Sequence, residues 1–217
     1  MVDGVRLSLI DDTSRPDHHH LTAEDNCYYL YEYTSHRDYS FSATNNLISN
    51  LKKKPSQADQ PHYWYKGQAI GSCASALSAA LNPNWLATAT LVPVPGSKAP
   101  GHPEHDDRIE RICRLMRQPP PDVRPLVRQS LSTNASHEVA QGERVTVEKL
   151  LELYAIDEAL VEPAPQALAI VDDVLTAGTH YRAMHTILSD RFPGIPITGL
   201  FVARRVFPDD PLDFGEL

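Results

Sequence analysis

Residues 168–179 read Leu-Ala-Ile-Val-Asp-Asp-Val-Leu-Thr-Ala-Gly-Thr, and this stretch decides the fold. Its first four residues are all apolar, which is typical of a strand covered on both faces of a parallel sheet. We expect that strand to span residues 166–171 and to deliver two adjacent carboxylates, Asp172 and Asp173, at its carboxyl end. Open α/β sheets bind their ligands at that edge. The segment therefore predicts both an architecture and the position of a site.

The regions on either side of this strand alternate between predicted strands and helices. Apolar runs predict further strands at residues 27–34, 87–94 and 195–206. Apolar residues at helical spacing predict helices at residues 45–54, 65–81, 107–116, 145–153 and 179–192. Such alternation is the pattern of a mostly parallel sheet flanked by helices, so the fold class is α/β.

The turn after the two acids has the features of a phosphate site. Gly178 allows the backbone to approach a ligand closely, and the first N–H groups of the next helix lack partners within that helix. The hydroxyls of Thr176 and Thr179 complete a cradle for a phosphate. Carboxylates accept hydrogen bonds from vicinal hydroxyls, so Asp172 and Asp173 beside this cradle favour a sugar phosphate. A phosphorelay receiver and a purely structural capping turn are the alternative interpretations.

This segment resembles the motif with which type I phosphoribosyltransferases bind 5-phosphoribosyl 1-diphosphate (PRPP). The shared pattern is four apolar residues, two acids, two apolar residues and a small turn rich in threonine and glycine. The resemblance implies that Asp172 and Asp173 are the catalytic acids, which hold the ribose hydroxyls or magnesium-bound water. It also implies that the 5′-phosphate binds the turn, which consists of Thr176, Ala177, Gly178, Thr179 and His180. His180 departs from the family pattern, because a small residue is common there, and it could crowd the phosphate or donate to it.

A second segment supports this resemblance. Residues 91–98 read Leu-Val-Pro-Val-Pro-Gly-Ser-Lys and are similar to the pyrophosphate loop of the same family. A strand that turns abruptly into a loop offers backbone N–H groups and a lysine to a diphosphate. The predicted pyrophosphate loop consists of Pro95, Gly96, Ser97 and Lys98.

A wider resemblance to the ComF-like and amidophosphoribosyltransferase-like branch covers residues 45–206. It includes a lysine-ended helix at residues 50–54, Asp-Asp-Arg at residues 106–108, and the last strand. The mobile catalytic loop of that branch corresponds to residues 128–144, so Arg128 and Arg144 are candidates to close over the site.

The resemblance implies a domain division and an activity. Residues 45–206 form the phosphoribosyltransferase-like domain, and residues 1–44 form a hood or an added strand. The tail, residues 207–217, contributes to the hood. The implied reaction is magnesium-dependent transfer of phosphoribosyl from PRPP to an unidentified nitrogen acceptor, with release of diphosphate. The family often forms homodimers. Two alternatives stay open: a module that senses PRPP or a nucleoside monophosphate without turnover, and a DNA-processing accessory of the ComF kind, whose zinc ribbon is absent here.

Composition limits the other classes of function. The 217 residues carry 20 basic and 28 acidic side chains, and this net charge of −8 gives no strong signal for nucleic acid. No stretch reaches the roughly 18 apolar residues of a membrane span, and no signal peptide is visible, so we expect a cytoplasmic protein. Three widely separated cysteines predict neither a disulfide framework nor structural zinc. The sequence predicts no protein metal ligand beyond Asp172 and Asp173 acting through water.

Overall fold

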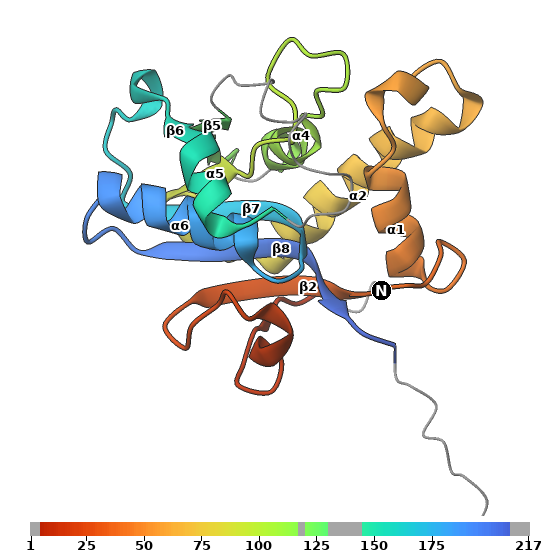
Figure 1. The fold of residues 1–217 in the computed structure, drawn as a ribbon, viewed down its shortest axis with the longest axis horizontal. Coiled ribbons are helices and arrows are strands. Elements are labelled where there is room, and N and C mark those ends of the chain that lie inside the picture. The colour runs from red at the N-terminus through yellow and green to blue at the C-terminus, as the bar shows by residue number, and fades with distance from the viewer. Residues whose placement is uncertain (1–4, 117–119, 130–144, 209–217) are drawn as a thin grey trace, which may run out of the picture.

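A computed structural model describes residues 5–116, 120–129 and 145–208 of the chain. The strands of its main sheet are β1 (Ser8–Leu9), β2 (Asn26–Thr34), β3 (Ala89–Pro93), β4 (Asp122–Val123), β7 (Ala167–Leu175) and β8 (Ile197–Val206). The helices are α1 (Ala43–Leu51), α2 (Trp64–Ala80), α3 (Pro83–Leu86), α4 (Arg108–Leu115), α5 (Val147–Leu153) and α6 (Thr179–Arg191). Figure 1 shows how these elements are arranged.

The main sheet has the strand order β1-β2-β8-β7-β3-β4. All neighbouring strands are parallel except β1, which pairs antiparallel with β2. In the central strand β7, residues 168–171 are fully buried, as their uninterrupted apolar sequence predicts. The prediction of an α/β fold with a mostly parallel sheet flanked by helices is therefore confirmed.

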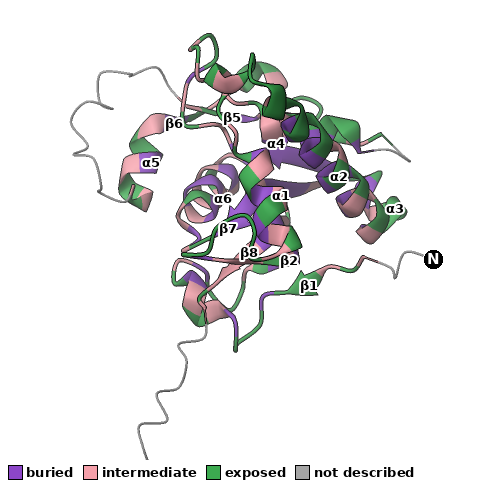
Figure 2. Cartoon of the chain, turned by 90° about the vertical axis from the view of Figure 1, so that its right-hand side faces the viewer, coloured by how far each residue is buried: buried purple, intermediate pink, exposed green. Residues whose placement is uncertain are grey.

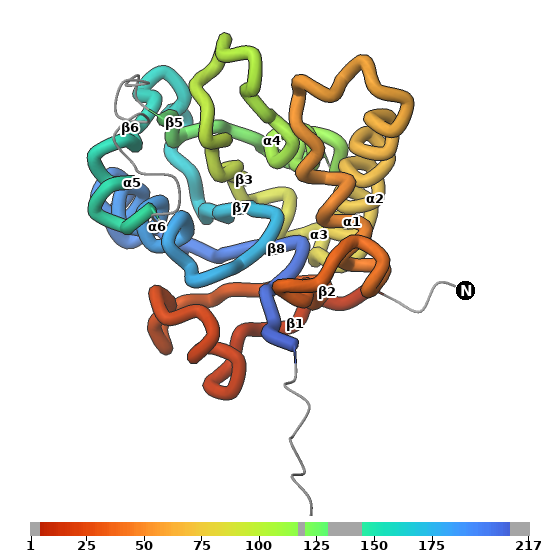
Figure 3. The backbone as a smooth tube through the Cα atoms, turned by 45° about the vertical axis from the view of Figure 1, so that its right-hand side comes forward, coloured from red at the N-terminus to blue at the C-terminus, as the bar shows by residue number. Residues whose placement is uncertain are grey.

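Two apolar cores lie on the two faces of this sheet. One core contains residues of α1, α2 and α4 together with Ala169 and Val171, which point to one face of β7. The other contains residues of α6 and α5 together with Leu168 and Ile170, which point to the opposite face. Figure 3 shows β3, β7 and β8 between α6 on one side and α1 and α2 on the other. Figure 2 shows that the buried residues concentrate in this central layer.

A smaller, two-strand sheet lies beside the second core. Its strands are β5 (Val127–Gln129) and β6 (Tyr154–Ile156), which pair antiparallel. Val127 and Tyr154 belong to the same core as α6, so this sheet is packed against the main body rather than standing apart.

The amino-terminal segment extends the main sheet and supports the turn that follows β7. β2 pairs with β8 along most of its length. Between β1 and β2, a 3₁₀-helix (Arg15–His18) lies against that turn. The His20 backbone N–H donates to the carbonyl of Ala177 at 3.0 Å, and the buried ring of His18 bonds through Nδ1 to the carbonyl of Thr176. The tail beyond residue 208 lies outside the described residues.

Most of the predicted elements are present, with shifted ends. The central strand was expected to end at residue 171, but β7 continues to Leu175, so Asp172 and Asp173 lie within the strand rather than after it. The first predicted helix, expected to reach residue 54, ends at Leu51 because Pro55 follows closely and begins a separate 3₁₀ turn. Four strands, β1, β4, β5 and β6, and the helix α3 were not predicted, because with two to four residues they show no periodicity. No helix in the described part of the chain is long and apolar enough to span a membrane.

Candidate functional site

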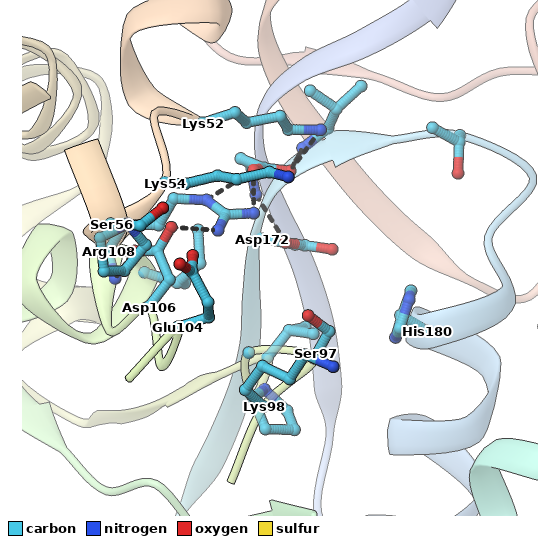
Figure 4. A pocket seen from close by; sticks show the side chains of 18 residues that line it. Lys52, Lys54, Ser56, Ser97, Lys98, Glu104, Asp106, Arg108, Asp172 and His180 are labelled. Carbon is cyan, nitrogen blue, oxygen red and sulfur yellow. Dashed lines mark hydrogen bonds and ion pairs between the residues drawn. The ribbon is translucent and has the colours of Figure 1, made fainter. Parts of the chain in front are cut away.

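A cavity of about 740 Å³ opens where β3 and β7 end. Four segments form its wall: the loop after α1, the loop after β3, the start of α4, and the end of β7 with the start of α6. Figure 4 shows the side chains that these segments direct into the cavity. The structure thus brings the predicted acid pair and the predicted pyrophosphate loop to one place, at the sheet edge where ligands bind in open α/β folds.

Asp173 is held by charged partners. It is only 4% exposed. Its Oδ2 accepts hydrogen bonds from Arg108 Nε at 2.9 Å and from Arg108 Nη2 at 2.7 Å. Its Oδ1 accepts from the backbone N–H of Val174 at 2.7 Å and lies 3.5 Å from Lys52 Nζ. Burial alone would raise the pKa of Asp173, but the charges of Lys52 and Arg108 outweigh it and hold that pKa below its usual range.

Asp172 differs from Asp173 in its exposure and in its partners. It is partly exposed to the cavity, and its Oδ1 accepts a hydrogen bond from the backbone N–H of Asp173 at 2.8 Å. No side chain among the described residues pairs with its carboxylate. Burial, and then the charge of Asp173, raise the pKa of Asp172 to about 7. Of the two predicted catalytic acids, Asp172 is therefore the one whose carboxylate is open to a ligand.

A chain of alternating charges extends from Asp173 into the protein. Arg108, which bonds Asp173, also donates through Nη1 to Asp106 Oδ2 at 2.8 Å. Lys66, which is 2% exposed, donates to the same Asp106 oxygen at 2.8 Å. Lys66 also donates to the carbonyls of Leu51 and Lys53, at the end of α1. This network joins α1, α2, α4 and β7, so it fixes the walls of the cavity relative to one another.

The turn that was predicted to bind a phosphate immediately precedes α6 and includes its first residues. Gly178 has φ +89°, and a Cβ there would lie 3.3 Å from the side chain of Leu21, so the turn requires glycine. Thr176 and His180 line the cavity, whereas Ala177, Gly178 and Thr179 are not part of its lining. His180 Nδ1 lies 2.8 Å from the hydroxyl of Tyr154, on β6.

The predicted pyrophosphate loop lines the cavity with all four residues, from Pro95 to Lys98. A Cβ on Gly96 would lie 2.8 Å from the carbonyl oxygen of Asp106, so the loop approaches the start of α4 closely and needs glycine there. The ring nitrogen Nδ1 of His105 lies 2.8 Å from the carbonyl oxygen of Lys98, and this hydrogen bond fixes the backbone of the loop. Within the described residues, the Lys98 ammonium has no ion-pair partner.

Several lining residues were not predicted as site residues. They are Lys52, Lys54, Ser56, Glu104, Asp106 and Arg108. The lysines follow the end of α1, and the run of three lysines at residues 52–54 was their only signal in the sequence. With Lys98, these cations give the cavity four positively charged side chains, and the lining also carries four acidic ones. Lys52 and Arg108 are paired with acids of the lining, so Lys54 and Lys98 are the cations that a negatively charged ligand would meet unpaired among the described residues.

Of the two predicted arginines, the structure describes only Arg128. Arg128 is on β5, forms an ion pair with Asp157, and does not line the main cavity. It lines a smaller cavity of about 320 Å³, which shares the residues Pro95, Gly96 and Lys98 with the main one. Arg144 lies outside the described residues.

The donor set around the cavity suits magnesium only in partnership with a ligand. The described residues contain no group of three side chains that could hold a metal ion. Magnesium commonly binds through one or two carboxylates, retained waters and substrate phosphates rather than an all-protein cage. The open carboxylate of Asp172, in a cavity that Lys54 and Lys98 also line, fits that mode.

Comparison with known proteins gives no family for this chain. No protein-family model matches it. No curated protein matches it either.

Proposed function

We propose that the cavity binds PRPP with magnesium, and that the protein transfers its phosphoribosyl group to a nitrogen acceptor, with release of diphosphate. The observation that carries this proposal is the open carboxylate of Asp172, which lines one cavity with Thr176 and His180 of the turn at the start of α6 and with the loop that contains Lys98. A sugar that bears a phosphate at one end and a diphosphate at the other would meet all three features.

Each part of the ligand has a matching group. The ribose hydroxyls would donate to Asp172, and the 5′-phosphate would lie at the start of α6, where free N–H groups and the positive end of the helix dipole favour an anion. The diphosphate would lie at residues 95–98, close to the ammonium of Lys98. Asp173 would act through Arg108, which it orients with two hydrogen bonds.

In the proposed reaction, the bond from the anomeric carbon to the diphosphate oxygen breaks and a carbon–nitrogen bond forms. The acceptor nitrogen loses a proton, and the diphosphate takes the bonding electron pair. Lys98 and Arg108 would stabilise the charge that develops on the leaving group, because fixed charges in a recessed site act more strongly than in water. Magnesium, bound with the diphosphate, would supply further positive charge to the leaving group.

Calorimetric titration with PRPP and MgCl₂ tests the binding step. We expect saturable binding by the wild-type protein and a loss of affinity of about tenfold or more in Asp172→Asn, because a hydrogen bond to a charged group contributes about 1.5–3 kcal/mol. The control is Asp59→Asn, since Asp59 is exposed and does not line the cavity. Absence of binding, or equal affinity in Asp172→Asn and the control, would refute the proposal.

A sensor without turnover is the second candidate, because Asp173 is already occupied by Arg108 and Lys52 and leaves one open acid. Incubation with PRPP, magnesium and a set of nitrogenous bases and amines, followed by measurement of diphosphate, separates the two. Binding with diphosphate release supports transfer, whereas binding without release from any acceptor supports the sensor.

A further inference from the structure

The pair formed by Tyr154 and His180 joins the small sheet to the cavity. Tyr154 is on β6 and is 7% exposed, and its hydroxyl lies 2.8 Å from His180 Nδ1. His180 is the second residue of α6, and Figure 4 shows its ring projecting from that helix into the cavity. The two rings are inclined at 34°, with centroids 6.4 Å apart. One ring nitrogen is thus engaged by a buried partner, while the ring itself faces the space where a ligand would bind.

The chemistry of the two groups decides which atom carries the proton. Burial raises the pKa of Tyr154, so its hydroxyl stays protonated. Desolvation by the surrounding protein lowers the pKa of His180, which favours the neutral imidazole. A phenol is the better donor and an imidazole nitrogen the better acceptor. Tyr154 therefore donates to Nδ1, and the single ring proton of His180 is on Nε2.

The surroundings keep this arrangement in place. Tyr154 belongs to the core that contains residues of α6, such as Ala183 and Met184, so its ring cannot turn away without opening that core. His180 is in the first turn of α6, beside the backbone N–H groups that have no partners within the helix. An Nε2–H group at this position adds a side-chain donor to a row of backbone donors.

We propose that Tyr154 is a positioning residue that fixes His180 as the Nε2–H tautomer, and that this N–H donates to the phosphate monoester of the bound ligand. This inference rests on the proposed function, because the phosphate monoester is the 5′-phosphate of PRPP or of a related ribose phosphate. It gives the histidine at the end of the turn a role as a donor rather than as an obstacle. It also links the occupancy of the phosphate position to the small sheet through one hydrogen bond.

The first test reads the tautomer directly and needs no ligand. ¹⁵N spectra of histidine-labelled wild-type protein would assign the ring by the signals that disappear in His180→Ala. We expect a protonated Nε2 and an unprotonated Nδ1 in the wild type, and a mixture of tautomers in Tyr154→Phe. A protonated Nδ1 in the wild type, or an unchanged ratio in Tyr154→Phe, overturns the inference.

The second test uses ribose 5-phosphate and inorganic diphosphate as separate probes. We expect His180→Ala to weaken ribose 5-phosphate binding about tenfold or more, as for loss of a hydrogen bond to a charged group. His180→Gln should recover part of that loss, because its amide can donate. Tyr154→Phe should weaken binding a few fold. Diphosphate binding should stay within twofold in all three variants, whereas a general disturbance of the fold would weaken both probes. The matched control is His185→Gln, on the same helix but outside the cavity lining.

The outcomes distinguish this inference from the proposed function. If the wild type binds ribose 5-phosphate and the His180 variants bind it equally well, the inference is wrong and the proposed function stands. If His180→Ala binds ribose 5-phosphate more tightly than the wild type, the histidine crowds the phosphate and the inference is again wrong. If the wild type binds neither ribose 5-phosphate nor PRPP, both fail.

Discussion

Replacement of Arg108 by methionine removes the charge that holds Asp173 and keeps much of the side-chain volume. The variant leaves the Asp173 carboxylate, 4% exposed, with Lys52 at 3.5 Å as its remaining cationic partner. It also removes one of the two cations that pair with Asp106. Breaking a buried ion pair by deleting one partner typically costs about 3–5 kcal/mol, because a charge stays buried without compensation. Lys52 is 45% exposed and screened by water, so we expect it to recover little of that loss.

We therefore expect Arg108→Met to lower the free energy of unfolding by about 3 kcal/mol, or the melting temperature by roughly 6–12 °C for a chain of this size. Arg114→Met is the matched control, since Arg114 lies on the same helix in an exposed pair with Glu110, worth about 0.3–0.5 kcal/mol. Thermal and urea unfolding at neutral pH measure both.

The pH dependence of this difference has a definite sign. The pKa of Asp173 is depressed in the folded protein, so its ion pair contributes stability above the pKa of the unfolded chain, near 4, and loses it as the pH falls below that value. The gap between the wild type and Arg108→Met should therefore shrink in acid. If Arg108→Met and Arg114→Met melt within about 1 °C of each other at neutral pH, where each degree corresponds to a few tenths of a kcal/mol, the argument for a buried ion network is wrong.

The remaining predictions concern Asp172 and the pyrophosphate loop. The pKa of Asp172 is raised to about 7 in the folded protein, so folding becomes less favourable as the pH rises from the unfolded value, near 4, to about 7. Asp172→Asn should therefore have a higher melting temperature than the wild type at pH 8, and this difference should vanish near pH 4. Melting curves recorded across this pH range test the prediction. A difference in melting temperature that is independent of pH would contradict it. Gly96→Ala should lower the free energy of unfolding by about 1–3 kcal/mol, because its Cβ would lie 2.8 Å from the Asp106 carbonyl oxygen. Gly67 is in α2, and a Cβ added there would meet no atom of the described residues within 4 Å beyond its chain neighbours and the backbone of its own helix. Gly67→Ala should therefore raise the free energy of unfolding by about 0.5–1 kcal/mol. Equal urea midpoints for Gly96→Ala and Gly67→Ala would contradict this account.

The sequence was sufficient to predict the architecture because the decisive elements are long and strongly patterned. The uninterrupted apolar run before Asp172 predicted a strand buried on both faces, and β7 is that strand. The small residues at helical spacing in residues 65–81 predicted α2 within one residue at each end. The strands of the small sheet have three residues each and exist because of the tertiary contacts of Val127 and Tyr154, which no local pattern reveals.

The site was predictable only as two isolated segments. The acid pair and the loop at residues 95–98 were recognisable, and both line the cavity. The partners that set their chemistry are far away in the chain: 65 residues separate Arg108 from Asp173, and 26 separate Tyr154 from His180. Pairs so far apart in the chain form only because of how the helices pack on the sheet. No local sequence pattern predicts which residues that packing brings together.

The different states of the two acids follow from the geometry of a strand. Successive side chains of a strand point in different directions, so the two adjacent acids on β7 meet different neighbours although both line the cavity. Asp173 continues the row of Ala169 and Val171 toward the core of α1, α2 and α4, where Arg108 is its partner. Asp172 has no side-chain partner among the described residues and is partly exposed where it lines the cavity. Two adjacent acids at the end of a buried strand can therefore have different partners while both line one cavity. Here Asp173 joins a helix to the sheet, and Asp172 stays open to the cavity with its pKa raised by burial and by the charge of Asp173.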